Sequence, residues 1–436
     1  MFTPTKRRAF SAAAILMTSA LALSACSGGN AGGGDSAGEF DPDAPVTLNF
    51  AFWGNDVRAD LYTKAIAAFN EEYPSITVNS TFLDFPAFWE KRQTEAAGGG
   101  LPDVMQFDYS YLRQYSDSNL LLDLEPYLDE TISTDGLSEN ILQIGVVNDV
   151  TTAIATSTNA WGMYTNPKLA ESIGVEAYAG GGSWDEYKDY MEEATDAGAS
   201  AGIFGGADWT GRIQNFELQL RAEGDSLFTE DGEAGFDKDR LAEFWEEGAD
   251  VRDGIGISAQ RQEEVFPLSG FDSALTLSEL TWDNFGAGYL GNLGADYTEL
   301  GLVEPPVTKE GAKDLYLKPS MLHAVAASTD HPEAATVLVD FLINSPEAGA
   351  IFGTNRGLPA SETQLEGVEL GGLETQVRDY ETDIADRLGD APPVPIVGFG
   401  SLEEKFRQIG QELGYGTITV DEAVDQFFAE MDVVLE

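Results

Sequence analysis

Tryptophans and planar polar side chains follow the predicted strands in the first part of this chain. Large apolar residues fall at every second position from Val46 to Trp53, and further strands are predicted over 76–82 and 103–107. Ligands of an open α/β sheet bind beyond the carboxyl ends of its strands. The residues just past these ends, which are candidates for one binding site, are Trp53, Asn55, Asp84, Asp108 and Tyr109.

Loops in the second part of the chain carry the same kinds of side chain. The candidates there are Asn159, Trp161, Trp209, Arg212, Glu279, Trp282 and Asp283. Carboxylates, amides and guanidinium groups can each form two hydrogen bonds to neighbouring hydroxyls. Indole rings pack against C–H faces and bury much area while few rotors become ordered. Together these groups suit a sugar ring, and such a site needs neither a metal ion nor a nucleophile.

Some of the aromatic and acidic residues have a simpler interpretation. Trp184 follows a predicted helix cap and Trp245 sits inside an amphipathic helix, so both are expected to pack in a core. Trp89 fits either role, and each candidate carboxylate competes with many solvated ones. We therefore expect some of the candidate residues to pack in a core or face solvent instead of contacting a ligand.

Composition excludes several classes of partner. The 436 residues include 24 Lys and Arg against 75 Asp and Glu, a formal net charge of −51. Nucleic acid and anionic membrane surfaces both require clustered positive charge, so neither is expected to bind through a basic face. The apolar and aromatic fractions, 43% and 11%, are those of a globular protein. Two histidines are too few for most zinc sites, and no phosphate-binding loop or EF-hand loop is present.

The N-terminus has the organisation of an export signal. Basic residues at 6–8 precede an apolar stretch from Ala9 to Ala22, which is too short for a permanent membrane span. Leu23-Ser24-Ala25-Cys26 follows and contains the only cysteine of the chain. This run resembles the lipobox of bacterial lipoproteins, which implies cleavage before Cys26 and lipidation of its sulfur. We therefore expect a signal peptide over 1–25 and a flexible Gly-, Ser- and Asp-rich tether over 26–45.

Strands alternate with helices from residue 46 onwards. Apolar residues mark one face of a helix over 61–73, and a second helix is predicted over 88–97 between the second and third strands. A helix capped by Ser183 is predicted to run to Ala197, and others begin near His331 and Ser345. This order indicates βαβ units with a mainly parallel sheet, and the length suggests two domains.

The order of segments resembles the extracellular solute-binding proteins of carbohydrate ABC transporters, the group that includes maltose-binding protein. Each matching stretch is weak alone, but their shared order and spacing carry the resemblance. The stretches are Leu101-Pro102-Asp103-Val104-Met105, Leu120-Leu121-Leu122-Asp123-Leu124, Trp161-Gly162-Met163-Tyr164-Thr165-Asn166, Ser183-Trp184-Asp185-Glu186-Tyr187, Tyr316-Leu317-Lys318-Pro319-Ser320, His331-Pro332-Glu333-Ala334-Ala335, Asp340-Phe341-Leu342 and Asn355-Arg356-Gly357-Leu358-Pro359-Ala360-Ser361.

The resemblance implies an α/β periplasmic-binding-protein-like fold of type II. Two lobes are expected, each a mainly parallel sheet flanked by helices, with a ligand cleft and a hinge between them. The first lobe would comprise 46–152 and 319–355, and the second 153–305 and 356–436, with a hinge crossover at 306–318. Hinge strands are expected near 150–156 and 303–318. The resemblance also places Arg356 and Phe399 at the border of the cleft.

The function that the resemblance implies is capture of a mono- or oligosaccharide and its delivery to an ABC permease with a cytoplasmic ATPase. The protein would be a monomer without cofactor, metal or catalytic activity, lipid-anchored at Cys26 on the outer side of the cell membrane. Two alternatives stay open: an exported carbohydrate-active hydrolase with two catalytic carboxylates, and a binding protein of the same fold for a peptide, polyamine or metal. The identity of the sugar does not follow from the sequence.

Overall fold

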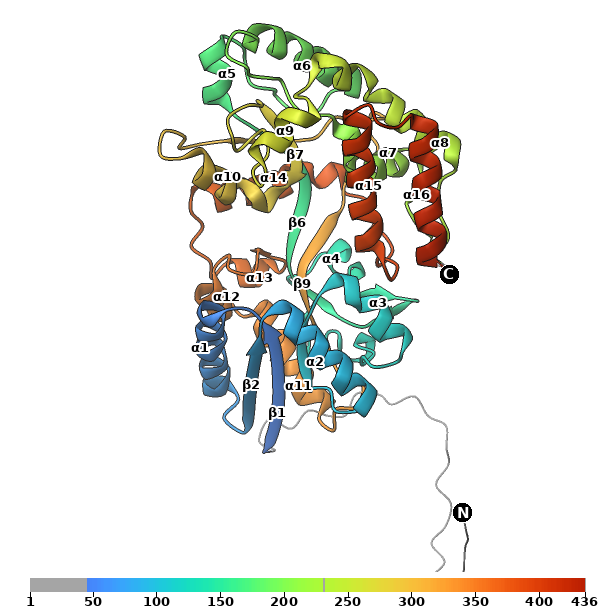
Figure 1. Ribbon diagram of the computed structural model, residues 1–436. Coiled ribbons are helices and arrows are strands. Elements are labelled where there is room, and N and C mark those ends of the chain that lie inside the picture. The colour runs from blue at the N-terminus through green and yellow to red at the C-terminus, as the bar shows by residue number, and fades with distance from the viewer. Residues whose placement is uncertain (1–44, 230–231, 436) are drawn as a thin grey trace, which may run out of the picture. The chain divides into compact units, whose positions relative to one another are not determined.

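The computed structural model describes residues 45–229 and 232–435 (Figure 1). The predicted signal peptide, Cys26 and the tether up to residue 44 lie outside the described residues. Among the described residues no single helix is long and apolar enough to cross a membrane; only the bent pair Pro332–Asn344 and Pro346–Phe352 meets the length and composition requirements together.

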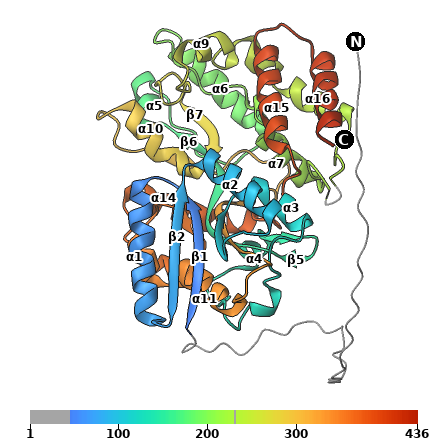
Figure 2. The same cartoon turned by 60° about the horizontal axis from the view of Figure 1, so that its bottom comes forward.

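The first part of the chain forms the predicted βαβ units. They consist of β1 (Val46–Trp53), α1 (Asp56–Glu72), β2 (Ile76–Leu83), α2 (Phe85–Gly98) and β3 (Val104–Phe107). β1 pairs in parallel with both β2 and β3. Figure 2 shows α1 beside these parallel strands. The alternation of strands and helices read from the sequence is confirmed.

Two long antiparallel strands continue this sheet. β6 (Ile154–Thr165) is buried along its whole length, and its first half pairs with β9 (Leu317–Val325), which pairs in turn with β3. The second half of β6 pairs with β7 (Ser278–Trp282) and β8 (Gly301–Val303). The strand order is β10-β6-β9-β3-β1-β2, where β10 is Leu358–Pro359. A short hairpin of β4 (Val146–Val147) and β5 (Val150–Thr151) precedes β6.

The strands around the second half of β6 pair antiparallel. A mainly parallel sheet was expected in each lobe, and for these strands that expectation is wrong because β7 and β8 both run back along β6. Only the β1–β2 and β1–β3 pairs among the named strands are parallel. The molecule therefore has a mixed sheet with one parallel end.

Helices cover the sheet and complete the chain. In the first half they are α3 (Tyr109–Asp117), α4 (Glu139–Gln143), α5 (Pro167–Ile173), α6 (Trp184–Gly198), α7 (Ile213–Glu223), α8 (Lys238–Glu247) and α9 (Ala259–Val265). In the second half they are α10 (Gly286–Leu293), α11 (Pro332–Asn344), α12 (Pro346–Phe352), α13 (Glu362–Leu365), α14 (Gly372–Asp383), α15 (Phe399–Gly414) and α16 (Val420–Leu435). The predicted capping box of Ser183 and Glu186 opens α6, and Ser345 caps α12.

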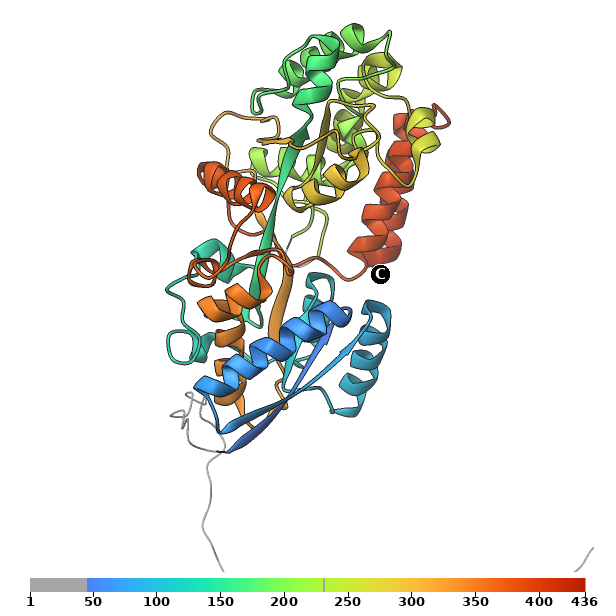
Figure 3. The same ribbon diagram turned by 90° about the vertical axis from the view of Figure 1, so that its left-hand side faces the viewer.

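Two large hydrophobic cores define two lobes. The core of the first lobe draws on residues from 48–155 and 322–352 and on Val394. The core of the second lobe draws on residues from 160–280 and 380–431 and on Leu315. β6 contributes Ile154 to the first core and Met163 to the second, so this one strand belongs to both lobes; Figure 3 shows it running between them. The expected hinge segments overlap the starts of β6 and β9.

Candidate functional site

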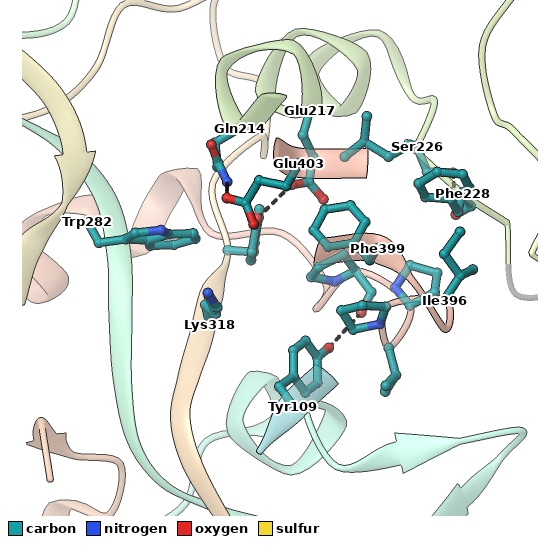
Figure 4. Close-up of a pocket in the computed structure, with 16 residues that line it drawn as sticks. Tyr109, Gln214, Glu217, Ser226, Phe228, Trp282, Lys318, Ile396, Phe399 and Glu403 are labelled. Atoms are coloured by element: carbon teal, nitrogen blue, oxygen red, sulfur yellow. Dashed lines mark hydrogen bonds between the residues drawn. The ribbon is translucent and has the colours of Figure 1, made fainter. Parts of the chain in front are cut away.

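A cavity lies beside β9 and receives side chains from both lobes (Figure 4). The first lobe supplies Tyr109 at the start of α3, and the second supplies residues of α7, β7 and α15. We call it the interlobe cavity. Its lining consists of Tyr109, Gln214, Glu217, Ser226, Leu227, Phe228, Trp282, Tyr316, Lys318, Pro392, Pro393, Val394, Pro395, Ile396, Phe399 and Glu403.

Trp282 provides a flat apolar surface in the cavity. The ring lies at the end of β7, is partly exposed, and meets Tyr316 edge-on with ring centroids 6.0 Å apart. The Lys318 Nζ is 4.9 Å from the centroid of the indole. An indole held this way can pack against one side of a ligand ring, while the ammonium group beside it can donate hydrogen bonds.

Polar groups from α7 and α15 also line the cavity. Gln214 and Glu217, one helical turn apart on α7, are each only 8% exposed. The Tyr316 hydroxyl donates to Glu217 Oε2 at 2.6 Å, and Gln214 Nε2 donates to Glu403 Oε1 at 2.6 Å. Burial raises the pKa of Glu217, and the Tyr316 hydrogen bond and the charges of Arg221 and Lys318 oppose that rise. The cavity therefore combines acceptors, donors and flat rings.

The segment 391–396 forms a wall that joins the two lobes. The Tyr109 hydroxyl donates to the Pro392 carbonyl at 3.3 Å, and Arg113 donates to the Val394 carbonyl through Nε at 3.0 Å and Nη2 at 2.8 Å. Val394 packs in the core of the first lobe, although α15, which follows this segment, belongs to the second. Three prolines restrict the backbone of this wall.

The candidates from the first lobe lie together at one sheet edge. Trp53 and Leu83 are paired at the ends of β1 and β2, as the strand-end argument predicts. Asn55, Asp84 and Asp108 are the N-caps of α1, α2 and α3, and each side chain accepts a hydrogen bond from a backbone N–H of its helix. Of these candidates only Tyr109 lines the interlobe cavity. Ligand contact by the others stays a prediction.

Two tryptophans expected at the site lie in the core of the second lobe. Trp161 is 2% exposed and its indole N–H donates to Asn215 Oδ1 at 2.8 Å. Trp209 is 3% exposed and stacks on Trp184 with centroids 5.3 Å apart. The physical reason is position: Trp161 lies in the middle of the buried strand β6, and η2 (Trp209–Gly211) is covered by α8 and α15. Neither ring reaches the cavity.

Arg356, expected at the border of the cleft, is held inside the first lobe. Its guanidinium donates to the Leu342 carbonyl at 2.9 Å and to Gln364 Oε1 at 3.1 Å, and lies 3.8 Å from the centre of the Phe352 ring. The side chain is 3% exposed, so its contacts are structural. Phe399, by contrast, lines the interlobe cavity.

Arg212 and Glu279 line a different cavity, between α9 and α15. Arg212 Nη2 and Glu279 Oε1 are 2.8 Å apart and form an ion pair. Burial raises the pKa of Glu279, and Arg212 opposes that rise. This pair is therefore separate from the group around Trp282.

Asn159 and Asp283 line a third cavity, together with Thr354 and residues of α14. Asn159 Nδ2 donates to Ser320 Oγ at 2.9 Å, and Asp283 Oδ2 accepts from the Ala160 N–H at 2.9 Å. Asp283 is fully buried; burial and the neighbouring Glu381 raise its pKa. These contacts fasten β6 to β9 and to the end of β7.

Sequence reasoning missed much of the polar lining. Gln214, Glu217 and Glu403 lie on helices rather than at strand ends, so the strand-end argument does not predict them. Tyr316 entered only as part of a segment that supported the resemblance, whereas Lys318 was also a candidate for offsetting the repulsion of an anionic sugar. Tyr316 directly precedes β9 and Lys318 lies two residues later, a spacing that favours the same face of an extended chain.

A metal centre finds no support in the described ranges. Among residues 45–229 and 232–435 no group of three or more His, Cys, Asp or Glu side chains has the arrangement that holds a metal ion.

The family model of bacterial extracellular solute-binding proteins matches residues 55–349. An extracellular solute-binding protein of family 1 from Alicyclobacillus acidocaldarius has a similar structure, with TM-score 0.77 and 25% identity over 91% of this chain and 100% of that chain. A periplasmic oligogalacturonide-binding protein from Yersinia enterocolitica gives TM-score 0.78 at 20% identity, over 89% and 98% of the two chains. An ABC substrate-binding protein from Listeria monocytogenes, solved with cycloalternan, gives 0.68 at 18% identity over the same shares.

Proposed function

We propose that this chain, which belongs to the family of bacterial extracellular solute-binding proteins, captures a saccharide between its lobes and delivers it to an ABC importer. The observation that carries this proposal is the interlobe cavity, where Trp282 faces a set of hydrogen-bonding groups from α7 and α15. The flat indole ring matches the C–H face of a sugar, and the planar polar groups match its hydroxyl edge. The saccharides bound by the Yersinia and Listeria proteins support this ligand class.

Closure of the lobes about β6 and β9 would trap the ligand. Hinge bending around a ligand is an established motion of two-lobed binding proteins. A ligand favours the closed form only if it binds that form better, which here requires contacts with both lobes. Tyr109 on the first lobe and Trp282 on the second line the same cavity, which supports contacts with both lobes.

Titration calorimetry with a panel of mono- and oligosaccharides tests the proposal. We expect at least one saccharide to bind with a saturable heat, and we expect the radius of gyration from X-ray scattering to decrease when it binds. A panel of neutral, acidic and amino saccharides without any binder would contradict the proposal.

Anchoring by lipid at Cys26 is a second part of the proposal. It is supported by the lipobox-like run before Cys26 and by the single cysteine of the chain. In a bacterial host the mature protein should partition into detergent, and its N-terminal peptide should carry the mass of a diacylglyceryl cysteine. The Cys26→Ser variant should lose both properties, and a wild-type protein found free in the medium would contradict anchoring.

Binding without catalysis is the third part. The family is one of solute-binding proteins, which supports a role in which no bond is made or broken. Glu217 and Glu403 are the carboxylates that line the cavity, and a hydrolase would need such a pair. Overnight incubation with the best-binding oligosaccharide should leave it intact by chromatography; hydrolysis that Glu217→Gln abolishes would establish the hydrolase instead.

A further inference from the structure

We propose, on the basis of the proposed function, that the interlobe cavity selects saccharides without acidic groups, and that Glu217 is the residue that sets this selection. The proposal concerns the charge of the ligand, which the family does not determine.

Glu217 presents an acceptor to the cavity and has a fixed position. It lies on α7 with 8% of its surface exposed, and the Tyr316 hydroxyl already donates to Oε2 at 2.6 Å. That hydrogen bond holds the group as an acceptor, because the Tyr316 proton points toward it. A ligand that meets Glu217 must therefore offer a hydroxyl or ammonium donor.

Two cations lie near Glu217. Lys318, which lines the cavity, lies over the Trp282 ring, and its charge opposes the rise that burial causes in the pKa of Glu217. Arg221 does not line the cavity; it donates to the Asp314 carbonyl at 2.9 Å and the Asp390 carbonyl at 2.6 Å. An acidic sugar would have to compete with Glu217 for Lys318.

The cavity lining has an excess of negative charge. Glu217 and Glu403 carry two negative charges against the one positive charge of Lys318. A uronate would add a further negative charge to a partly desolvated site, where like charges repel more strongly than in water. The net charge of −51 acts in the same direction at longer range. A hydroxyl or ammonium group at the same position gains a charge-assisted hydrogen bond instead.

The test is calorimetry with matched saccharides on the mature protein. The probes are neutral disaccharides of glucose, galactose and mannose. Each neutral disaccharide is compared with two counterparts: one oxidised to a uronic acid at C6, and one with an amino group at C2. For every neutral disaccharide that binds, we expect its uronate to bind at least about tenfold more weakly.

Two variants locate the effect. Glu217→Gln keeps the shape of the side chain and removes its charge. The ratio of the uronate dissociation constant to that of the neutral sugar should fall by about tenfold, mainly because the uronate binds more tightly. The control Glu404→Gln removes the same charge from α15 at an exposed position outside the cavity, where Glu404 pairs with Arg407. It should leave the ratio unchanged. Circular dichroism of both variants checks that the fold is retained.

The outcomes separate the two proposals. A uronate that binds as tightly as its neutral counterpart, or an equal effect of both variants, would overturn the selection while leaving saccharide capture in place. If Glu217→Gln fails to fold, Glu217→Asp, which keeps the charge, is compared with Glu217→Asn, which removes it, and a preference for the neutral sugar that is lost only in Glu217→Asn supports the role of this carboxylate. Absence of binding in all three series would overturn both proposals.

Discussion

Trp161 and Trp282 form a directly paired couple across β6 and β7, yet they have different surroundings. Trp161 lies in the core with its N–H bonded to Asn215, whereas Trp282 is partly exposed to the interlobe cavity. Trp161 lies inside β6 and Trp282 is the last residue of β7, but residue type and local sequence made both of them candidates for the site. Their environments are decided by α7 and α15, whose packing comes from distant parts of the chain.

This difference gives a paired prediction. Trp282→Ala should weaken saccharide binding at least about tenfold, since it removes the flat surface, with a modest loss of stability. Trp161→Ala should instead cost about 3–5 kcal/mol of unfolding free energy, because it leaves a cavity in a packed core. Calorimetry and urea unfolding measure the two effects. If the folded Trp282→Ala variant bound saccharide with unchanged affinity, the Trp282 ring would not be part of the binding site.

Asp283 and Glu381 lead to a prediction about pH. Burial raises the pKa of both carboxyls; the charge of Glu381 raises that of Asp283 further, whereas hydrogen bonds with Asp283 and Thr158 oppose the rise for Glu381. Between pH 4 and 7 the folded state therefore holds more protons than the unfolded chain. The unfolding free energy should therefore fall as the pH rises through this range. Glu381→Gln removes the second carboxyl and should reduce this fall by on the order of 1 kcal/mol.

Chemical unfolding of both proteins at a series of pH values measures the slope. Asp379→Asn serves as the control, because Asp379 lies on the same helix, α14, but is exposed and paired with Arg378. Equal slopes in wild type and Glu381→Gln would show that this pair does not hold the extra proton.

At the scale of elements, local sequence patterns predicted helices, strands and caps well, but they did not predict which distant strands pair. The strands at 46–53 and 76–83, the Ser183 capping box and the Ser345 cap all follow from patterns within a few residues. The antiparallel course of β7 and β8 along β6 depends on contacts more than a hundred residues apart, and no local pattern encodes it. The wall at 391–396 was missed for the same reason, since proline-rich composition predicts an extended segment but not its partner.

The wall supplies a prediction at this scale. Arg113→Ala removes two hydrogen bonds to the Val394 carbonyl and should loosen the segment 391–396 from α3. Hydrogen exchange in the peptide that covers this segment should become faster, and saccharide affinity should fall about threefold to tenfold because the cavity loses a fixed wall. Arg378→Ala, an exposed arginine paired with its neighbour Asp379, is the control. Unchanged exchange would show that Arg113 does not hold the wall.

For the whole molecule, the charge balance dominates. The formal net charge of −51 makes the compact state repel itself, and salt screens such repulsion. The melting temperature should therefore rise by several degrees between low salt and about 1 M sodium chloride, where the screening length is about 3 Å. Calorimetric scans with sucrose as an uncharged control separate screening from solute exclusion. A melting temperature independent of salt would show that repulsion is already balanced within the fold.

The course of β6 has a practical consequence for anyone who wishes to dissect the protein. Twelve consecutive buried residues begin in one hydrophobic core and end in the other, with partners along the whole strand. Expressing either half as a separate fragment would leave a broken strand with an uncovered row of amide and carbonyl groups, which promotes aggregation. Biosensor designs should therefore keep the polypeptide intact and attach their reporters at surface loops.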